Sequence, residues 1–209
     1  MKRYPSNNRD WVTLNVEVTD LELLIGGWQV MQRWEEPLMR VLATEVTRNG
    51  GDILEVGFGM GISATAIMES GCASYTVIEA HPVVAQAARD WGESHSTPVT
   101  VVEGFWQEVI PGMGQRFDGI LFDTYPMSED ERSCNHYPFI GAARELLQVG
   151  GVLTVYSDET TDFRPEHLKL WLDNYEEVRL VKVEGLQPPP DCEYWNQTTM
   201  VIPVGTRRA

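Results

Sequence analysis

Three glycines and one acidic residue form the first group of residues whose types and spacing suggest chemistry. Gly57, Gly59 and Gly61 directly follow a short apolar stretch, in the pattern Gly-x-Gly-x-Gly. Such a turn lets the backbone approach a ligand closely, and the helix expected after it presents free amide groups. Glu79 ends the next apolar stretch, where a carboxylate can accept hydrogen bonds from both hydroxyls of a ribose. The group predicts a site for an adenosine-containing ligand. The alternative is that the glycines only turn the chain and Glu79 is a solvated strand end.

Two further carboxylates lie where the chain changes direction. Asp123 ends the apolar run Ile-Leu-Phe and precedes Thr-Tyr-Pro, and Glu35 lies in the sequence Trp-Glu-Glu-Pro. A carboxylate at the carboxyl end of a parallel strand lies near the ligand crevice of the sheet and can accept a proton there. Aspartate is also common in turns, and an acid just before Pro37 suits the start of a helix. The residue types alone leave both interpretations open.

The alternation of apolar strands with helical stretches predicts the scaffold that would position these residues. Strand-helix alternation of this kind is typical of a parallel sheet with helices on both faces. The expected strands cover 52–56, 74–80, 99–104, 117–123 and 152–157, and the expected helices cover 62–71, 82–94, 137–151 and 165–175.

The two ends of the chain depart from this alternation. Residues 1–25 are polar and irregular, and residues 28–46 have a helical composition with a break at Pro37, which we expect to open a second helical segment. Residues 177–186 and 198–205 are β-rich with no helical pattern between them, so we expect an antiparallel pair at the sheet edge. The predicted fold class is therefore α/β and Rossmann-like, with a mostly parallel seven-stranded sheet and a terminal antiparallel pair.

Composition narrows the classes of partner and compartment. The chain has 209 residues, with 31 acidic and 16 basic side chains and a formal net charge of −15. So acidic a surface repels phosphate backbones and anionic membranes, and we expect neither nucleic acid nor a membrane as a partner. The N-terminus lacks the apolar core of a secretory signal. The three cysteines and four histidines have neither disulfide-framework nor metal-ligand spacing, so we expect no metal and a cytoplasmic location.

Five stretches resemble the guanidinoacetate N-methyltransferase family, a class I family that depends on S-adenosylmethionine. The first and third stretches are specific to this family, whereas the glycine loop is shared by many methyltransferases. The resemblance implies a Rossmann-like methyltransferase that acts on a guanidino group of a small molecule, with guanidinoacetate as the family default. It also implies an N-terminal lid segment, 1–27, and a single methyltransferase domain, 28–209. The stretches are VMQRWEEPLM (30–39), LEVGFGMGI (54–62), FDGILFDTYP (117–126), GGVLT (150–154) and PPPDCEYW (188–195).

The resemblance assigns roles to individual residues. Glu35 and Asp123 match two carboxylates that hold the guanidinium, with Asp123 as the proton acceptor and Glu35 as the clamp. Tyr125 either orients the substrate or packs under the loop. Met31 and Met39 would border the cofactor, although methionines at such positions are often core residues. The residues expected at S-adenosylmethionine are Trp11, Met31, Met39, Glu55, Gly57, Gly59, Met60, Gly61, Ile62, Ser63, Ala64, Glu79, Ala80, His81, Gly104, Phe105, Trp106 and Asp123.

One segment departs from the family. The family holds the substrate carboxylate through backbone amides just after the fifth strand, where this chain has Asp158 and Glu159. If both acids face the substrate, they repel a carboxylate and attract an ammonium group. Arginine, or an arginine-derived compound with a free amine, is therefore an alternative substrate, with Asp158 and Glu159 among the substrate-binding residues. More distant alternatives are an NAD-dependent oxidoreductase and a non-catalytic ligand-sensing relative. We expect a monomer or a homodimer.

Overall fold

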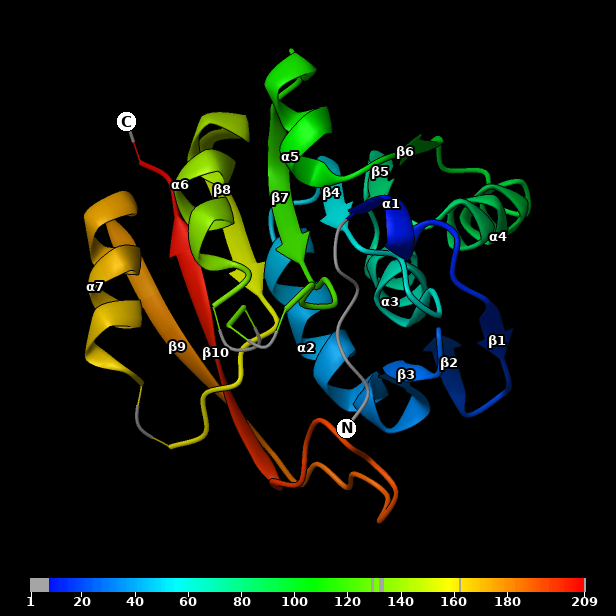
Figure 1. The fold of residues 1–209 in the computed structure, drawn as a ribbon. Helices are drawn as coiled ribbons and strands as arrows, with labels where there is room; N and C mark the ends of the chain where they lie inside the picture. The colour runs from blue at the N-terminus through cyan, green and yellow to red at the C-terminus, as the bar shows by residue number, and fades with distance from the viewer. Residues whose placement is uncertain (1–7, 129, 132–133, 162, 209) are drawn as a thin grey trace.

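The computed structural model describes residues 8–128, 130–131, 134–161 and 163–208. Within these residues the main sheet has seven strands in the order β6-β5-β4-β7-β8-β10-β9 (Figure 1). The first five strands in this order (β6, β5, β4, β7 and β8) are parallel, whereas β10 runs antiparallel to both β8 and β9. The predicted fold class is confirmed. The strands are β4 (Asp52–Val56), β5 (Ser74–Glu79), β6 (Val99–Glu103), β7 (Phe117–Phe122), β8 (Leu147–Val155), β9 (Glu177–Glu184) and β10 (Thr199–Thr206).

The helices begin and end where proline and glycine place them. Pro37, Pro82, Pro138 and Pro165 all lie in the first turn of a helix, where the missing amide costs no hydrogen bond. Gly71 ends α3 with a φ of 91°, a conformation that favours glycine. The helices are α1 (Asn8–Trp11), α2 (Glu36–Thr47), α3 (Ile62–Ser70), α4 (Pro82–Gly92), α5 (Trp106–Val109), α6 (Tyr137–Leu146) and α7 (Pro165–Asn174), with short 3-10 turns η1 (Arg33–Glu35) and η2 (Ile110–Gly112).

Both faces of the main sheet are buried, because successive strand residues point into different apolar clusters. In β4, Ile53 packs in the cluster that includes residues of α2, α3 and α4, whereas Leu54 packs in the cluster formed with α6 and α7. In Figure 1, α6 and α7 lie in front of the sheet and α2 lies behind it. Helices on both faces leave the edge at the carboxyl ends of the parallel strands as the place for a ligand.

The expectation of a helix is wrong for residues 28–32, and so is the description of residues 1–25 as irregular throughout. Residues Trp28–Gln32 form strand β3, which pairs antiparallel with β2 (Glu22–Ile25), and β2 pairs with β1 (Val16–Val18). Leu23 and Ile25 alternate with less buried neighbours along β2, so burial of one strand face outweighs the helical composition of the 28–36 stretch. This small sheet joins residues on both sides of the predicted boundary at 27/28.

The helix predicted over residues 137–151 is also too long. Helix α6 ends at Leu146, and β8 begins at Leu147, which pairs with Phe117 of β7. The glycine pair lies inside β8, where the pairing register shifts between Phe117 and Gly119 and Gly150 has a φ of 84°. The pair therefore accommodates a bulge in a strand and does not end a helix.

Two searches of the described residues bear on the predicted partners. None of the helices in this part of the chain is both long and apolar enough to cross a membrane. No group of three or more His, Cys, Asp or Glu side chains that could hold a metal ion occurs in the same residues.

Candidate functional site

The site lies where the chain order of the parallel strands reverses. Strands β5 and β6 lie on one side of β4, and β7 and β8 lie on the other, so a crevice opens between the ends of β4 and β7. Gly57 follows β4 and Asp123 follows β7. A Cβ atom on Gly57 would lie 1.9 Å from the Asp123 carbonyl oxygen, and Gly57 has a φ of 92°. Only glycine permits two turns to approach so closely.

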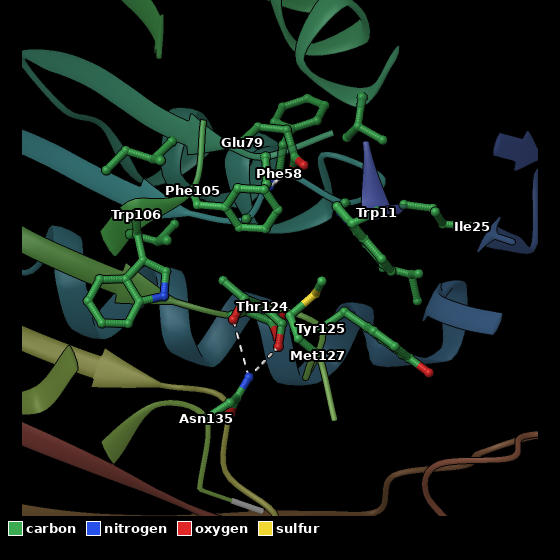
Figure 2. Close-up of a pocket in the computed structure, with 18 of the residues that line it drawn as sticks. Trp11, Ile25, Phe58, Glu79, Phe105, Trp106, Thr124, Tyr125, Met127 and Asn135 are labelled. Carbon is green, nitrogen blue, oxygen red and sulfur yellow. Dashed lines mark hydrogen bonds between the residues drawn. The ribbon is translucent and has the colours of Figure 1, made fainter. Parts of the chain in front are cut away.

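A cavity of about 310 Å³ opens beside this turn, and we call it the glycine-loop cavity. Figure 2 shows aromatic side chains around it, among them Phe58, Phe105 and Trp106. Asn135 donates hydrogen bonds to the Thr124 carbonyl oxygen (2.7 Å) and Oγ1 (3.2 Å), which fixes the turn after Asp123. The predicted cofactor residues that line this cavity are Trp11, Met31, Gly57, Gly59, Ser63, Glu79, Ala80, Phe105, Trp106 and Asp123.

Glu79 is held rigidly at the end of β5. Its Oε2 accepts a hydrogen bond from the Phe58 amide (2.9 Å), and its Oε1 accepts one from the His81 amide (2.8 Å). Burial raises the pKa of Glu79, and these backbone bonds act in the opposite direction. Each carboxylate oxygen retains a second lone pair, so Glu79 can still accept two hydroxyl groups from a ligand.

The N-terminal segment packs over the glycine-loop cavity through Trp11 and Met31. The Trp11 ring stacks on Tyr125, with centroids 5.5 Å apart and an interplanar angle of 13°. The Met31 sulfur accepts a hydrogen bond from the Met60 amide at 3.3 Å, and a Cβ atom on Gly59 would lie 2.7 Å from that sulfur. The small sheet therefore completes the wall that the glycine loop begins.

Several predicted cofactor residues do not line this cavity. Met39 is fully buried in the core. Glu55 is buried and accepts hydrogen bonds from Ser63 and Tyr75, and burial raises its pKa to about 8. His81 begins α4 and accepts a hydrogen bond from the Val83 amide. The predicted residues outside the lining are Met39, Glu55, Met60, Gly61, Ile62, Ala64, His81 and Gly104.

A second cavity of about 1080 Å³ adjoins the first, and we call it the carboxylate cavity. Glu35 and Asp123 both line it, although 87 positions of sequence separate them. Asp123 and Tyr125 also line the glycine-loop cavity, together with Val30, Thr124 and Asn135. Asp123 therefore lies where the two cavities meet, next to both candidate ligands.

The two carboxylates have no cationic partner in the cavity wall. Glu35 is 3% exposed, and its Oε1 accepts hydrogen bonds from the Gln32 amide (2.8 Å) and the Tyr194 hydroxyl (2.5 Å). Burial raises the pKa of Glu35 to about 8, and the charge of Asp123 contributes to this shift. Burial also raises the pKa of Asp123 to about 7. Among the described residues that line the cavity there is no lysine or arginine, so a bound cation would compensate both acids.

The aromatic residues of this cavity that were not predicted as site residues are Trp28, Phe122, Tyr156, Tyr194 and Trp195. Tyr194 donates to Glu35, and its place in the family-like stretch 188–195 was an available signal. The Tyr156 hydroxyl and the Trp28 indole nitrogen are buried without a hydrogen-bond partner in the described structure, and both residues line the carboxylate cavity. Tyr156 follows β8 directly, a position type that the strand-end argument for Asp123 could have included.

Of the two acids after β8 that were predicted to bind the substrate, only Asp158 lines the carboxylate cavity. Asp158 lines the carboxylate cavity and forms an ion pair with Arg164. Glu159 does not line it and is 4% exposed, accepting hydrogen bonds from Arg164 Nε (2.7 Å) and His167 Nδ1 (3.0 Å). Burial acts to raise the pKa of Glu159, but the bonds from Arg164 and His167 outweigh it and lower the pKa. Glu159 is a structural anchor of the following loop.

Comparison with families of known proteins identifies the chain. The family model described as guanidinoacetate N-methyltransferase matches residues 6–208. The chain belongs to this family. Membership confirms the resemblance found in the sequence and, with it, S-adenosylmethionine as the cofactor of this guanidinoacetate N-methyltransferase family member. It gives no support to the oxidoreductase alternative.

Curated relatives of this family member include fungal proteins named protein arginine N-methyltransferase 2. The chain is 33% identical to the protein from Aspergillus fumigatus over 179 residues, which cover 79% of this chain and 42% of the relative. It is 42% identical to the protein from Aspergillus oryzae over 105 residues, which cover 47% of this chain and 25% of the relative. The chain thus spans less than half the length of these relatives.

Solved structures with the same fold include other transferases. N-methyltransferase NodS from Bradyrhizobium japonicum has a TM-score of 0.63 at 14% identity, with 84% of this chain and 97% of that chain covered. Spermidine synthase from Thermotoga maritima has a TM-score of 0.62 at 14% identity, with 93% and 72% covered. At this identity the likeness concerns the fold alone.

Proposed function

We propose that this family member transfers a methyl group from S-adenosylmethionine to a guanidino nitrogen in the carboxylate cavity. The observation that carries the proposal is the pair of acids, the buried Glu35 and the partly buried Asp123, in a cavity wall whose described residues include no lysine or arginine. A guanidinium is planar and always charged in water, and its N–H groups match a carboxylate in two parallel hydrogen bonds. It would compensate both buried charges at once.

The residues of the glycine-loop cavity fit the cofactor. Gly57 allows close backbone approach, Glu79 retains lone pairs for the ribose hydroxyls, and Phe105 and Trp106 supply flat apolar surfaces for an adenine ring. Trp11, stacked on Tyr125, covers this cavity as a lid segment would. When bound, S-adenosylmethionine supplies a methyl group made electrophilic by its sulfonium.

Asp123 is the proposed proton acceptor. A guanidinium is a very weak acid, with a pKa far above neutral pH, and its nitrogens have no free lone pair for attack. Asp123 takes one N–H proton from the attacking nitrogen, and the electron pair of that bond forms the new N–C bond. With S-adenosylmethionine bound, the electron pair of the broken S–CH3 bond would stay on sulfur, so the products would be a neutral thioether, a methylated guanidinium and one proton held by Asp123. The position of Asp123 at the junction of the two cavities supports this role.

Glu35 is the proposed clamp. The Gln32 amide and the Tyr194 hydroxyl both donate to Oε1 and fix the carboxylate, which leaves Oε2 for the substrate. Fixing the plane of the guanidinium aligns one nitrogen with the S–CH3 bond, and such positioning can contribute several kcal/mol to catalysis, on the order of 7–11 in the best oriented reactions.

An arginine side chain, free or on a protein, is the second candidate for the guanidino group. Two observations favour it over guanidinoacetate: the curated fungal relatives are named protein arginine N-methyltransferase 2, and the carboxylate cavity of about 1080 Å³ is roomy for so small a molecule.

Product analysis tests the proposed function. The purified chain is incubated with S-adenosylmethionine and, in turn, guanidinoacetate, arginine and agmatine, and mass spectrometry follows both S-adenosylhomocysteine and the methylated guanidine. With at least one of these guanidines we expect equal amounts of the two products, and loss of both in Asp123→Asn. A separate thermal-shift titration compares S-adenosylhomocysteine with NAD, because only a ligand of the native state raises the melting temperature. Stabilisation by S-adenosylhomocysteine with no methylated guanidine from any substrate would contradict the proposal.

A further inference from the structure

The carboxylate cavity is acidic beyond the pair that holds the guanidinium. Asp158 and the exposed Glu193 also line it. The histidine among its described lining residues is His136, whose Nε2 shares a 2.9 Å hydrogen bond with His167 Nε2. Burial lowers the pKa of His136 well below the usual range, so this side chain adds no positive charge at neutral pH. A substrate in this cavity therefore meets four carboxylates and no cationic side chain among the described lining residues.

The backbone amides after β8 are already bonded to side chains of the chain itself. The Glu159 amide donates to Ser157 Oγ at 3.0 Å. The Asp158 carboxylate accepts a hydrogen bond from its own amide. Amides engaged in this way are not available to a substrate carboxylate. In the family, backbone amides of the corresponding segment are expected to bind that carboxylate.

Arg164, the cation next to this segment, is turned to other partners. It forms ion pairs with Asp158 and with Glu159, and it does not line the carboxylate cavity. His167 holds Glu159 from a second side, so the arginine is tied to a buried carboxylate of the loop before α7. The Arg164 side chain thus stays outside the lining and offsets part of the charge of Asp158, whereas Glu193 lines the cavity as an exposed acid.

We infer that the guanidino substrate carries a second positive charge, an amine, and no free carboxylate. This inference rests on the proposed function and specifies what carries the guanidine. The ammonium group lies toward Asp158 and Glu193 when Glu35 and Asp123 hold the guanidinium, because like charges repel across a binding site and opposite charges attract. The aromatic rings of Trp28 and Trp195, which line the same cavity, add favourable surfaces for a cation. The chemical class is a guanidinoalkylamine or an arginine whose carboxyl group is masked.

Three guanidines of matched length test the inference with the wild-type chain. Agmatine ends in an ammonium group, butylguanidine ends in a methyl group, and 4-guanidinobutyrate ends in a carboxylate. We expect kcat/KM to fall in that order, with agmatine at least about 100-fold above 4-guanidinobutyrate and butylguanidine between them. Arginine amide against arginine is the second pair, since only the masked carboxyl differs. Turnover of arginine amide but not agmatine identifies a masked arginine as the source of the amine. Turnover of agmatine but not arginine amide identifies a guanidinoalkylamine.

Two variants test the wall residues. Asp158→Asn and Glu193→Gln are each expected to lower kcat/KM for agmatine about 3–10-fold more than kcat/KM for butylguanidine, because butylguanidine has no ammonium group to lose a partner. A merely structural effect would lower both substrates equally. Glu93→Gln, an exposed acid that lines neither cavity, is the matched control.

The outcomes separate this inference from the function on which it rests. Equal turnover of the three guanidines, or a preference for 4-guanidinobutyrate, would overturn the inference while guanidino methylation stands. In the latter case, the unpartnered donors of Trp28 and Tyr156 would be the groups that bind the carboxylate. Absence of methylation with every guanidine, in a protein that S-adenosylhomocysteine still stabilises, would overturn the proposed function and this inference with it.

Discussion

Glu79 of the glycine-loop cavity has its partners in the chain itself, whereas Glu35 and Asp123 of the carboxylate cavity have no cationic partner among the described lining residues. Glu79 accepts one backbone amide on each oxygen. Glu35 and Asp123 are buried close enough to interact, with pKa values raised to about 8 and about 7, respectively. In the same cavity, Tyr156 and Trp28 have polar atoms without partners in the described structure.

The two cavities therefore bind their ligands in different ways. A neutral ribose needs only preformed hydrogen-bond acceptors, so its site can be satisfied before binding. A guanidinium brings the charge that its site lacks, so the carboxylate cavity is electrostatically complete only in the complex. The predictions below test that contrast, beginning with the largest expected effect.

Asp123→Asn should abolish most of the methyl transfer. The amide cannot accept the proton, and loss of a general base typically costs about 10²–10⁴-fold in kcat. Calorimetric binding of S-adenosylhomocysteine should change little, because the glycine-loop contacts remain. Asp90→Asn, on the exposed side of α4, is the control. Unchanged activity of Asp123→Asn would show that another group accepts the proton.

Glu35→Gln should weaken guanidine binding by about 1.5–3 kcal/mol, because a charge-assisted pair is lost. At high pH, the same substitution should raise the free energy of unfolding. The folded-state pKa of Glu35, about 8, exceeds its ordinary value of 4.5, so its contribution to stability is present at low pH and is lost as pH rises through 8. We therefore expect the variant to gain thermal stability relative to wild type between pH 5 and pH 9, as measured by calorimetry. A parallel loss of stability and binding at all pH values would contradict the assignment.

Gly57→Ala should damage both cavities together. The new methyl group would meet the Asp123 carbonyl at 1.9 Å, in a backbone conformation with a φ of 92°. A forced conformation of this kind costs about 1–3 kcal/mol of unfolding free energy, and movement of the turn should weaken both S-adenosylhomocysteine and the guanidine. Gly112→Ala, which would meet no atom within 4 Å, is the control. Denaturant unfolding and two separate ligand titrations measure the result.

The affinity for a guanidine should rise with pH between about 6 and 9. Below the raised pKa values of Asp123 (about 7) and Glu35 (about 8), the guanidinium must displace a proton to form its ion pairs, which costs up to about tenfold in affinity per pH unit for each proton. Calorimetry in buffers of different ionisation enthalpy should show proton release at pH 6.5. S-adenosylhomocysteine should show a much flatter pH dependence, and equal slopes for the two ligands would remove the contrast between the cavities.

Tyr156→Phe should have the smallest effect. The hydroxyl has no partner to lose in the unliganded chain, so the melting temperature should stay the same or rise. If the hydroxyl accepts a hydrogen bond from a guanidinium N–H, the transition-state stabilisation derived from kcat/KM should fall by about 0.5–1.5 kcal/mol. A lower melting temperature with unchanged kinetics would show that the hydroxyl has a structural partner instead.

Local patterns of the sequence predicted the strands from β4 to β8, most helix starts and the antiparallel pair β9 and β10. They failed for segments whose helical and extended conformations differ little in free energy. Residues Trp28–Gln32 have a helical composition but form β3, because Met31 is buried against the glycine loop. Leu147 continues a helical pattern but begins β8, because it pairs with Phe117. In both cases a contact with a distant segment outweighed a weak local preference.

By itself, the sequence determined the α/β alternation, the glycine loop with Glu79 at the next strand end, and the two motifs that contain Glu35 and Asp123. These features depend on residue type and short-range spacing, which the linear chain displays in full. Only the tertiary structure decided that Glu35 and Asp123 share one cavity without a cation, and that Asp158 faces this cavity while Glu159 is bound to Arg164 and His167. Which way an acid points after a strand depends on partners brought by other segments, and no local pattern contains that information.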